Sequence, residues 1–221
     1  MKPTKHLGDR WRGIAAREKI ASDLAFEMKA AVPPVVLTDR SDAEAGEEVH
    51  ACVSLQCYEH QWSWASCASF LARSDSPVGA AMARTVGEDV AAVLVMNHWV
   101  GQTEHNDHPH NIIWGYDDPV QGPSSFVFVD YATSLGFGGA WEGGRGERVA
   151  RAPFPDRLRA RVTPHQLDAA LDRLESLRHD VIEEVCMRLP PEFMCEHERL
   201  AVLSTLLARR ALVRAIIKGY D

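Results

Sequence analysis

The longest apolar stretch of the chain lies near its middle. Residues 78–100 favour helix, Pro77 stands where a first-turn proline would, and the residues after Asp89 are nearly all apolar. A helix that is apolar on every side is covered by protein on every side. The pattern therefore predicts the central helix of the domain over this stretch.

A second helix and two strands are expected nearer the N-terminus. In residues 13–32, apolar side chains recur at helical steps among charged ones, which is typical of an amphipathic helix, and the Pro33-Pro34 pair ends it. The apolar triplet 35–37 predicts a short buried strand, and residues 50–55 predict another. Between them, the acidic stretch 39–48 predicts a loop.

Farther along the chain, residues 62–71 favour helix. Two short β-rich runs, 112–114 and 126–129, are separated by the turn-rich stretch 115–125 and so predict a hairpin. The glycine-rich stretch 136–146 predicts a flexible loop.

The C-terminal part has the pattern of several helices. Thr163 followed by Pro164 indicates an N-cap and a first-turn proline, the Pro190-Pro191 pair interrupts the run, and residues 196–218 predict a last long helix. Helix content should exceed strand content. The expected fold class is therefore α+β and mostly helical.

Composition narrows the classes of partner. The 221 residues carry a formal net charge of −7 and are 46% hydrophobic, which is typical of a globular domain that builds its own core. A negative chain does not gather nucleic acid or anionic membrane, so we expect neither as a partner. Five cysteines without a C-x-x-C pair indicate reduced thiols, and with no apolar segment long enough for a signal peptide or a membrane span the expected compartment is the cytoplasm.

Candidate chemistry concentrates in residues 99–114, WVGQTEHNDHPHNIIW. This loop holds two acids, Glu104 and Asp107, and ends with Asn111 just before the first strand of the expected hairpin. The second strand ends at Asp130. Kinase-type sites use such an acid, asparagine and acid to hold nucleotide-bound Mg²⁺ through hard oxygen ligands.

These motifs resemble those of the HipA-like kinases, which are related to the phosphatidylinositol 3/4-kinase catalytic domain. The loop 99–114 is similar to the family's catalytic loop, and residues 128–132 (FVDYA) are similar to its metal motif. Upstream, residues 17–39 resemble the family's helix with its glutamate and the strand that follows. Downstream, residues 189–193 and 198–210 resemble its closing helices.

The resemblance implies an ATP- and Mg-dependent phosphotransferase whose acceptor, a protein Ser/Thr or a small molecule, is not encoded in these motifs. Asn111 and Asp130 would hold the metal and its nucleotide. The loop acid that orients the acceptor stays open. Alignment from Trp99 places Glu104 there, whereas counting back five residues from Asn111 reaches Asn106, next to Asp107.

The resemblance also implies a phosphate clamp, in which Lys2 or Lys5 pairs with Glu18 to steady the α- and β-phosphates. No glycine-rich loop precedes these lysines in the sequence given, so we expect either an N-terminal truncation or a protein that has lost this half of its nucleotide clamp. We therefore expect a small-lobe remnant over residues 1–61 and a helical, protein-kinase-like large lobe over residues 62–221.

Two other functions stay open. One is a noncatalytic pseudokinase or protein-interaction module that keeps the lobe and has lost the chemistry. The other is a metal-dependent hydrolase, which would require three of the neighbouring histidines to converge on a metal ion. Those histidines are His98, His105, His108 and His110.

Overall fold

The computed structural model describes residues 2–3, 13–42, 47–73, 75–118, 123–136 and 152–219. In chain order, the elements are β1 (Lys2–Pro3), α1 (Ile14–Met28), β2 (Val35–Asp42), β3 (Glu47–Ser54), β4 (His60–Ser63), α2 (Trp64–Cys67), the 3₁₀ helix η2 (Phe70–Ala72), α3 (Pro77–Val100), the 3₁₀ helix η3 (Pro109–Asn111), β5 (Ile112–Tyr116), β6 (Ser124–Phe128), α4 (Asp156–Arg159), α5 (Pro164–Ser176), α6 (His179–Met187), α7 (Glu196–Arg210) and α8 (Val213–Lys218). The fold class is α+β and mostly helical, as the sequence predicts.

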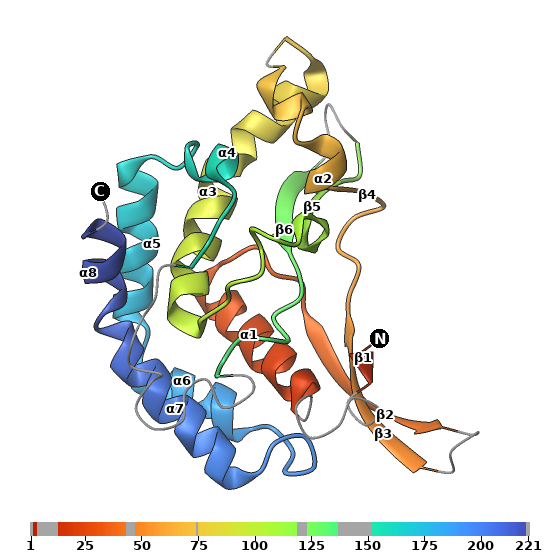
Figure 1. Ribbon diagram of the computed structural model, residues 1–221, viewed down its shortest axis with the longest axis vertical. Coiled ribbons are helices and arrows are strands. Elements are labelled where there is room, and N and C mark those ends of the chain that lie inside the picture. The colour runs from red at the N-terminus through yellow and green to blue at the C-terminus, as the bar shows by residue number, and fades with distance from the viewer. Residues whose placement is uncertain are drawn as a thin grey trace.

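The strands form two small antiparallel sheets, ordered β1-β3-β2 and β4-β5-β6. Figure 1 shows both sheets on one side of the molecule and helices α5 to α8 on the other, with α1 and α3 between them. Side chains from α1, α3 and the hairpin β5–β6 join one hydrophobic core. The predicted domain boundary at residue 61 stays a prediction.

Helix α3 is the central helix that the apolar stretch predicts. Its N-terminus is capped by Ser76, whose side chain accepts a hydrogen bond from the Gly79 N–H at 3.0 Å, and Pro77 occupies the first turn. Every residue from Val90 to Val100 is buried. The helix ends at Gly101, whose φ of 74° lies in the left-handed region that glycine adopts without strain.

The C-terminal end of α3 is fastened to α7. Arg209 of α7 is buried and donates to the carbonyl oxygens of Trp99 at 2.7 Å and His98 at 2.5 Å. The Trp99 indole N–H donates in return to the Leu206 carbonyl at 2.8 Å. A buried cation thus satisfies carbonyls that the end of a helix leaves without partners.

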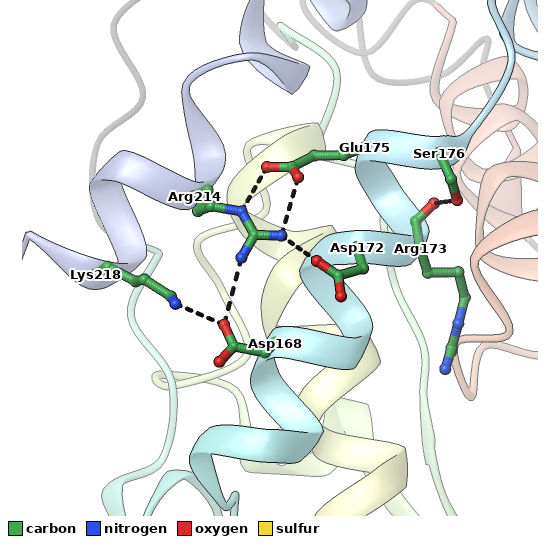
Figure 2. A network of polar contacts seen from close by, with 7 residues as sticks. All are labelled: Asp168, Asp172, Arg173, Glu175, Ser176, Arg214 and Lys218. Atoms are coloured by element: carbon green, nitrogen blue, oxygen red, sulfur yellow. Dashed lines mark hydrogen bonds and ion pairs between the residues drawn. The ribbon is translucent and has the colours of Figure 1, made fainter.

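The prediction of one helix over residues 196–218 is wrong in one respect, because the helix is interrupted between α7 and α8. After the break, α8 turns back onto α5. Figure 2 shows Arg214 of α8 meeting three acids of α5, at 3.3 Å from Asp168, 2.5 Å from Asp172 and 2.6 Å from Glu175. If α7 and α8 were one straight helix, Arg214 would be directed away from α5 and could not form these ion pairs. At its own start, α5 has the expected Thr163 cap.

Three other expected elements differ in extent. The helix expected over 62–71 begins only at Trp64, because Trp62 pairs with Trp114 in the edge strand β4. In the acidic stretch 39–48, expected to form a loop, the described residues are strand instead, with β2 continuing to Asp42 and β3 starting at Glu47, and residues 43–46 lie outside the described residues. Helix α1 ends at Met28, before the prolines. The glycine-rich loop lies almost wholly outside the described residues.

Within the described part of the chain, no helix combines the length and the apolar character that crossing a membrane requires.

Candidate active site

A cavity of about 370 Å³ lies between α1, the β2–β3 ribbon and the hairpin β5–β6. Three of the sequence-predicted residues line it: Glu18 from α1, Asn111 at the end of η3, and Asp130 just after β6. The other described lining residues are mostly apolar or neutral polar, and they are Val32, Pro33, Val35, Cys52, Ser54, Leu55, Gln56, Cys57, Tyr58, Gln61, Ile113, Val127 and Val129.

Asn111 and Asp130 are brought together by the hairpin. Ile112 pairs with Phe128 at the open end of the β5–β6 ladder, and the Val129 N–H donates to the Asn111 carbonyl at 2.9 Å. Asp130 therefore follows directly after the residue bonded to Asn111. The two side chains offer carboxylate and amide oxygens, the ligands that suit Mg²⁺ when phosphate and water fill its remaining positions.

The backbone at Asp130 has an uncommon conformation. Its φ of 69° lies in the left-handed region, which few residues other than glycine occupy and which aspartate tolerates better than most. The next residue, Tyr131, donates its backbone N–H to Glu18 Oε2 at 2.9 Å. The Asp130 carbonyl accepts a hydrogen bond from Gln102 Nε2. The peptide group between Asp130 and Tyr131 is thus held at both its carbonyl and its N–H by side chains from other elements.

His105 holds the residue on the other side of Asp130. It is fully buried, with Nε2 at 3.0 Å from the Val129 carbonyl and Nδ1 at 2.8 Å from Asn97 Nδ2. Because a carbonyl accepts and an amide nitrogen donates, the ring is the neutral tautomer with its proton on Nε2. Burial lowers the pKa of His105 to about 4, in agreement with a neutral ring.

The four histidines of the hydrolase hypothesis do not come together as its metal centre would require. His105 has both ring nitrogens engaged, and buried His98 donates from Nδ1 to the Leu94 carbonyl at 2.8 Å. His108 and His110 are exposed. Over the residues that the structure describes, no three His, Cys, Asp or Glu side chains gather as a metal site would require.

The two candidate loop acids are not among the described residues that line the cavity. Glu104 is half-buried, and its backbone N–H donates to Gln102 Oε1 at 3.0 Å. Asp107 is exposed and accepts from Asn106 Nδ2 at 3.0 Å. The backbone bonds that Asp107 and His108 donate to the Glu104 carbonyl, at 3.1 and 2.9 Å, fold this stretch into a tight turn.

Of the two candidate lysines, only the backbone of Lys2 is described. It pairs with Cys52 in β3, and Cys52 lines the cavity. Lys5 lies outside the described residues. Pairing of either lysine with Glu18 stays a prediction.

Sequence reasoning missed the segment between β3 and β4, which supplies Leu55, Gln56, Cys57 and Tyr58 to the cavity wall. It also missed buried Asn97, and it gave Gln102 no role beyond a place in the motif alignment. The predicted burial of the central helix includes the position of Asn97, but nothing in the sequence indicates its hydrogen-bond partners, the burial of Gln102 or the cavity lining by residues 55–58. Their positions follow from the connection between the two sheets and from partners far away in the chain.

Comparison of the chain with models of known protein families gives no match, and comparison with curated proteins gives none either.

Proposed function

We propose that the cavity binds a magnesium–nucleotide complex and that the protein is an ATP- and Mg-dependent phosphotransferase of HipA-like type. In this proposal, α1 and the first sheet correspond to a kinase-like small lobe, and the mostly helical remainder corresponds to the large lobe. One observation carries it. Glu18, Asn111 and Asp130, selected from three separate stretches of sequence for this chemistry, line a single cavity.

The cavity has the chemistry that such a ligand needs. Its volume of about 370 Å³ falls within the range of small-molecule sites. The oxygens of Asn111 and Asp130 would hold Mg²⁺, and bound ATP would supply the phosphoryl group. Apolar side chains such as Val35, Ile113 and Val127 offer the remaining wall to a flat base.

Charge makes the proposal specific. The described lining residues include two carboxylates, Glu18 and Asp130, and no Lys, Arg or His. A divalent cation held by Asp130 and Asn111 would supply the positive charge that attracts the triphosphate to this wall. Nucleotide binding should therefore depend strictly on a divalent metal.

Thermal unfolding tests the proposal. ATP with Mg²⁺ should raise the melting temperature, because at a hundredfold excess over Kd a ligand stabilises the folded state by about 2.7 kcal/mol. ATP with EDTA should not raise it. Asp130→Asn, which removes one charge from the metal ligands, should abolish the Mg–ATP shift, while Asp156→Asn, at an exposed acid of α4 outside the cavity, should keep it. Equal shifts in both variants would refute the assignment of Asp130.

A noncatalytic nucleotide-binding protein is the second candidate function. The observation that favours it is the position of Glu104 and Asp107, neither of which is among the described residues lining the cavity. Phosphoryl transfer from radiolabelled ATP to the protein itself, to acceptor peptides and to water separates the two. Transfer that falls in Glu104→Gln or Asp107→Asn supports the phosphotransferase, and Mg–ATP binding without transfer supports the pseudokinase.

A further inference from the structure

Two backbone positions flank Asp130, and both are connected to the same buried side chain. Val129 precedes Asp130 and accepts from His105 Nε2 at 3.0 Å, and Tyr131 follows it. Asn97, on α3, bonds to His105 Nδ1 at 2.8 Å through Nδ2 and accepts from the Tyr131 hydroxyl at 3.0 Å through Oδ1. Asn97 and Tyr131 are both fully buried.

We infer that Asn97 is a positioning residue for Asp130, acting through His105 and Tyr131. The inference rests on the proposed nucleotide site, in which Asp130 holds the metal. Asn97 is not among the described residues that line the cavity, so its effect on a ligand there is indirect. Its two hydrogen bonds instead connect the rigid central helix to the loop at His105 and to the segment after β6.

The hydrogen bonds of Asn97 matter because the backbone of Asp130 is in the left-handed conformation. A residue with a side chain leaves that conformation readily unless its surroundings impose it. Anchors on both flanks, at Val129 and Tyr131, restrict the alternatives. Losing one anchor lowers the fraction of molecules with Asp130 in the ligand-binding conformation, and apparent affinity falls by that same fraction.

Tyr131→Phe is the sharpest test, because the ring keeps its packing and the protein loses only the hydroxyl that donates a hydrogen bond to Asn97. We expect the affinity for Mg–ATP, measured by isothermal titration well below the melting temperature, to fall by up to about fivefold, the factor that a typical buried hydrogen bond supplies. Amide hydrogen exchange in residues 129–132 should become faster. Tyr116→Phe, at another buried tyrosine in β5, is the matched control and should leave both measurements unchanged.

Asn97→Leu is the second variant, since leucine has a similar volume and cannot form either bond. It should show the same two effects more strongly, provided that circular dichroism shows a folded chain. If Asn97→Leu does not fold, Tyr131→Phe decides alone.

The outcomes separate this inference from the proposed function. If the wild type binds Mg–ATP and Tyr131→Phe binds it equally well, the positioning role is refuted, even where the melting temperature falls. If the wild type binds no Mg–ATP, the proposed function fails, and amide exchange decides the inference. Faster exchange at 129–132 in Tyr131→Phe than in Tyr116→Phe would support the role of Asn97, and unchanged exchange would overturn it.

Discussion

At the scale of single residues, His105 shows how a charge can be excluded from the folded state. Its ring is fully buried beside the Phe128 and Tyr131 rings, at centroid distances of 5.5 and 5.2 Å. Its Nε2–H donates a hydrogen bond to the Val129 carbonyl, and its Nδ1 accepts one from the Asn97 side-chain amide. A second proton on the ring would turn Nδ1 into a donor facing the Asn97 amide donor. Protonation therefore breaks the bond to Asn97 and adds an unpaired buried charge.

His105 should make the stability of the folded protein depend on pH. The pKa of His105 is lowered to about 4 in the folded protein, against about 6.5 for an unfolded chain. Between these values the unfolded state binds the extra proton, so stability falls as the pH drops. From pH 7 to pH 5, this residue should cost about 2 kcal/mol.

Urea unfolding of wild type and His105→Gln at both pH values checks this expectation. The difference between the two proteins isolates His105, which is necessary because burial raises the pKa of Asp89 to about 7 and Asp89 therefore acts in the opposite direction. The free energy of unfolding of the variant should lose less on going to pH 5 than that of the wild type. Parallel pH profiles would show that His105 titrates normally.

At the scale of elements, two arginines that each connect a pair of helices should contribute very differently to stability. Arg209 is buried and bonded to the Trp99 and His98 carbonyls at the end of α3, whereas Arg214 makes its ion pairs with exposed acids of α5. Arg209→Gln should lower the free energy of unfolding by about 3 kcal/mol, because it leaves buried carbonyls without donors. Arg214→Gln should lower it by under about 1 kcal/mol.

Salt separates these two effects. Exposed ion pairs are screened at high ionic strength and buried contacts are not. In 1 M NaCl, a denaturant titration should show the cost of Arg214→Gln shrinking and that of Arg209→Gln unchanged. Similar costs for the two variants would contradict this account of the α3–α7 and α5–α8 contacts.

The elements that the sequence predicted well are those whose ends are encoded locally. Ser76 and Pro77 at the start of α3, Gly101 at its end and Thr163 at the start of α5 each act on their own helix. Elements defined by a distant partner were missed. Trp62 belongs to a strand only because Trp114, far along the chain, pairs with it, and no local pattern contains that information.

At the scale of the whole molecule, the cavity is assembled from segments far apart in the chain. Residue types, motif spacing and the resemblance to the HipA-like kinases selected Glu18, Asn111 and Asp130, which line this cavity. They were not enough to place Glu104 or Asp107, because the tight turn at Glu104 depends on backbone bonds that follow from the loop conformation. The position of the connection between the sheets, residues 55–59, could not be predicted either, because it too depends on the folded conformation. Tyr58 of this connection lines the cavity.

Tyr58 fastens that connection to the hairpin β5–β6, and a glycine makes the contact possible. A Cβ atom at Gly115 would lie 2.2 Å from Tyr58 Cδ2 and 2.7 Å from Cγ, so any side chain there must displace the ring. The Tyr58 hydroxyl is also 3.1 Å from Ser125 Oγ on β6. The ring thus ties the connection between the two sheets to the hairpin β5–β6, and Tyr58 itself lines the cavity.

A double-mutant cycle on Gly115 and Tyr58 should show that the two positions are coupled in their effect on stability. Gly115→Ala should destabilise the protein by about 1 to 3 kcal/mol, the usual cost of an overpacked contact, and should weaken Mg–ATP binding because Tyr58 moves with the cavity wall. In a Tyr58→Ala background the clash is gone, so the same glycine change should cost little. Urea unfolding of the four proteins measures the coupling. Equal costs of Gly115→Ala in both backgrounds would mean that the ring does not rest on the glycine, and that the two sheets are joined by other contacts.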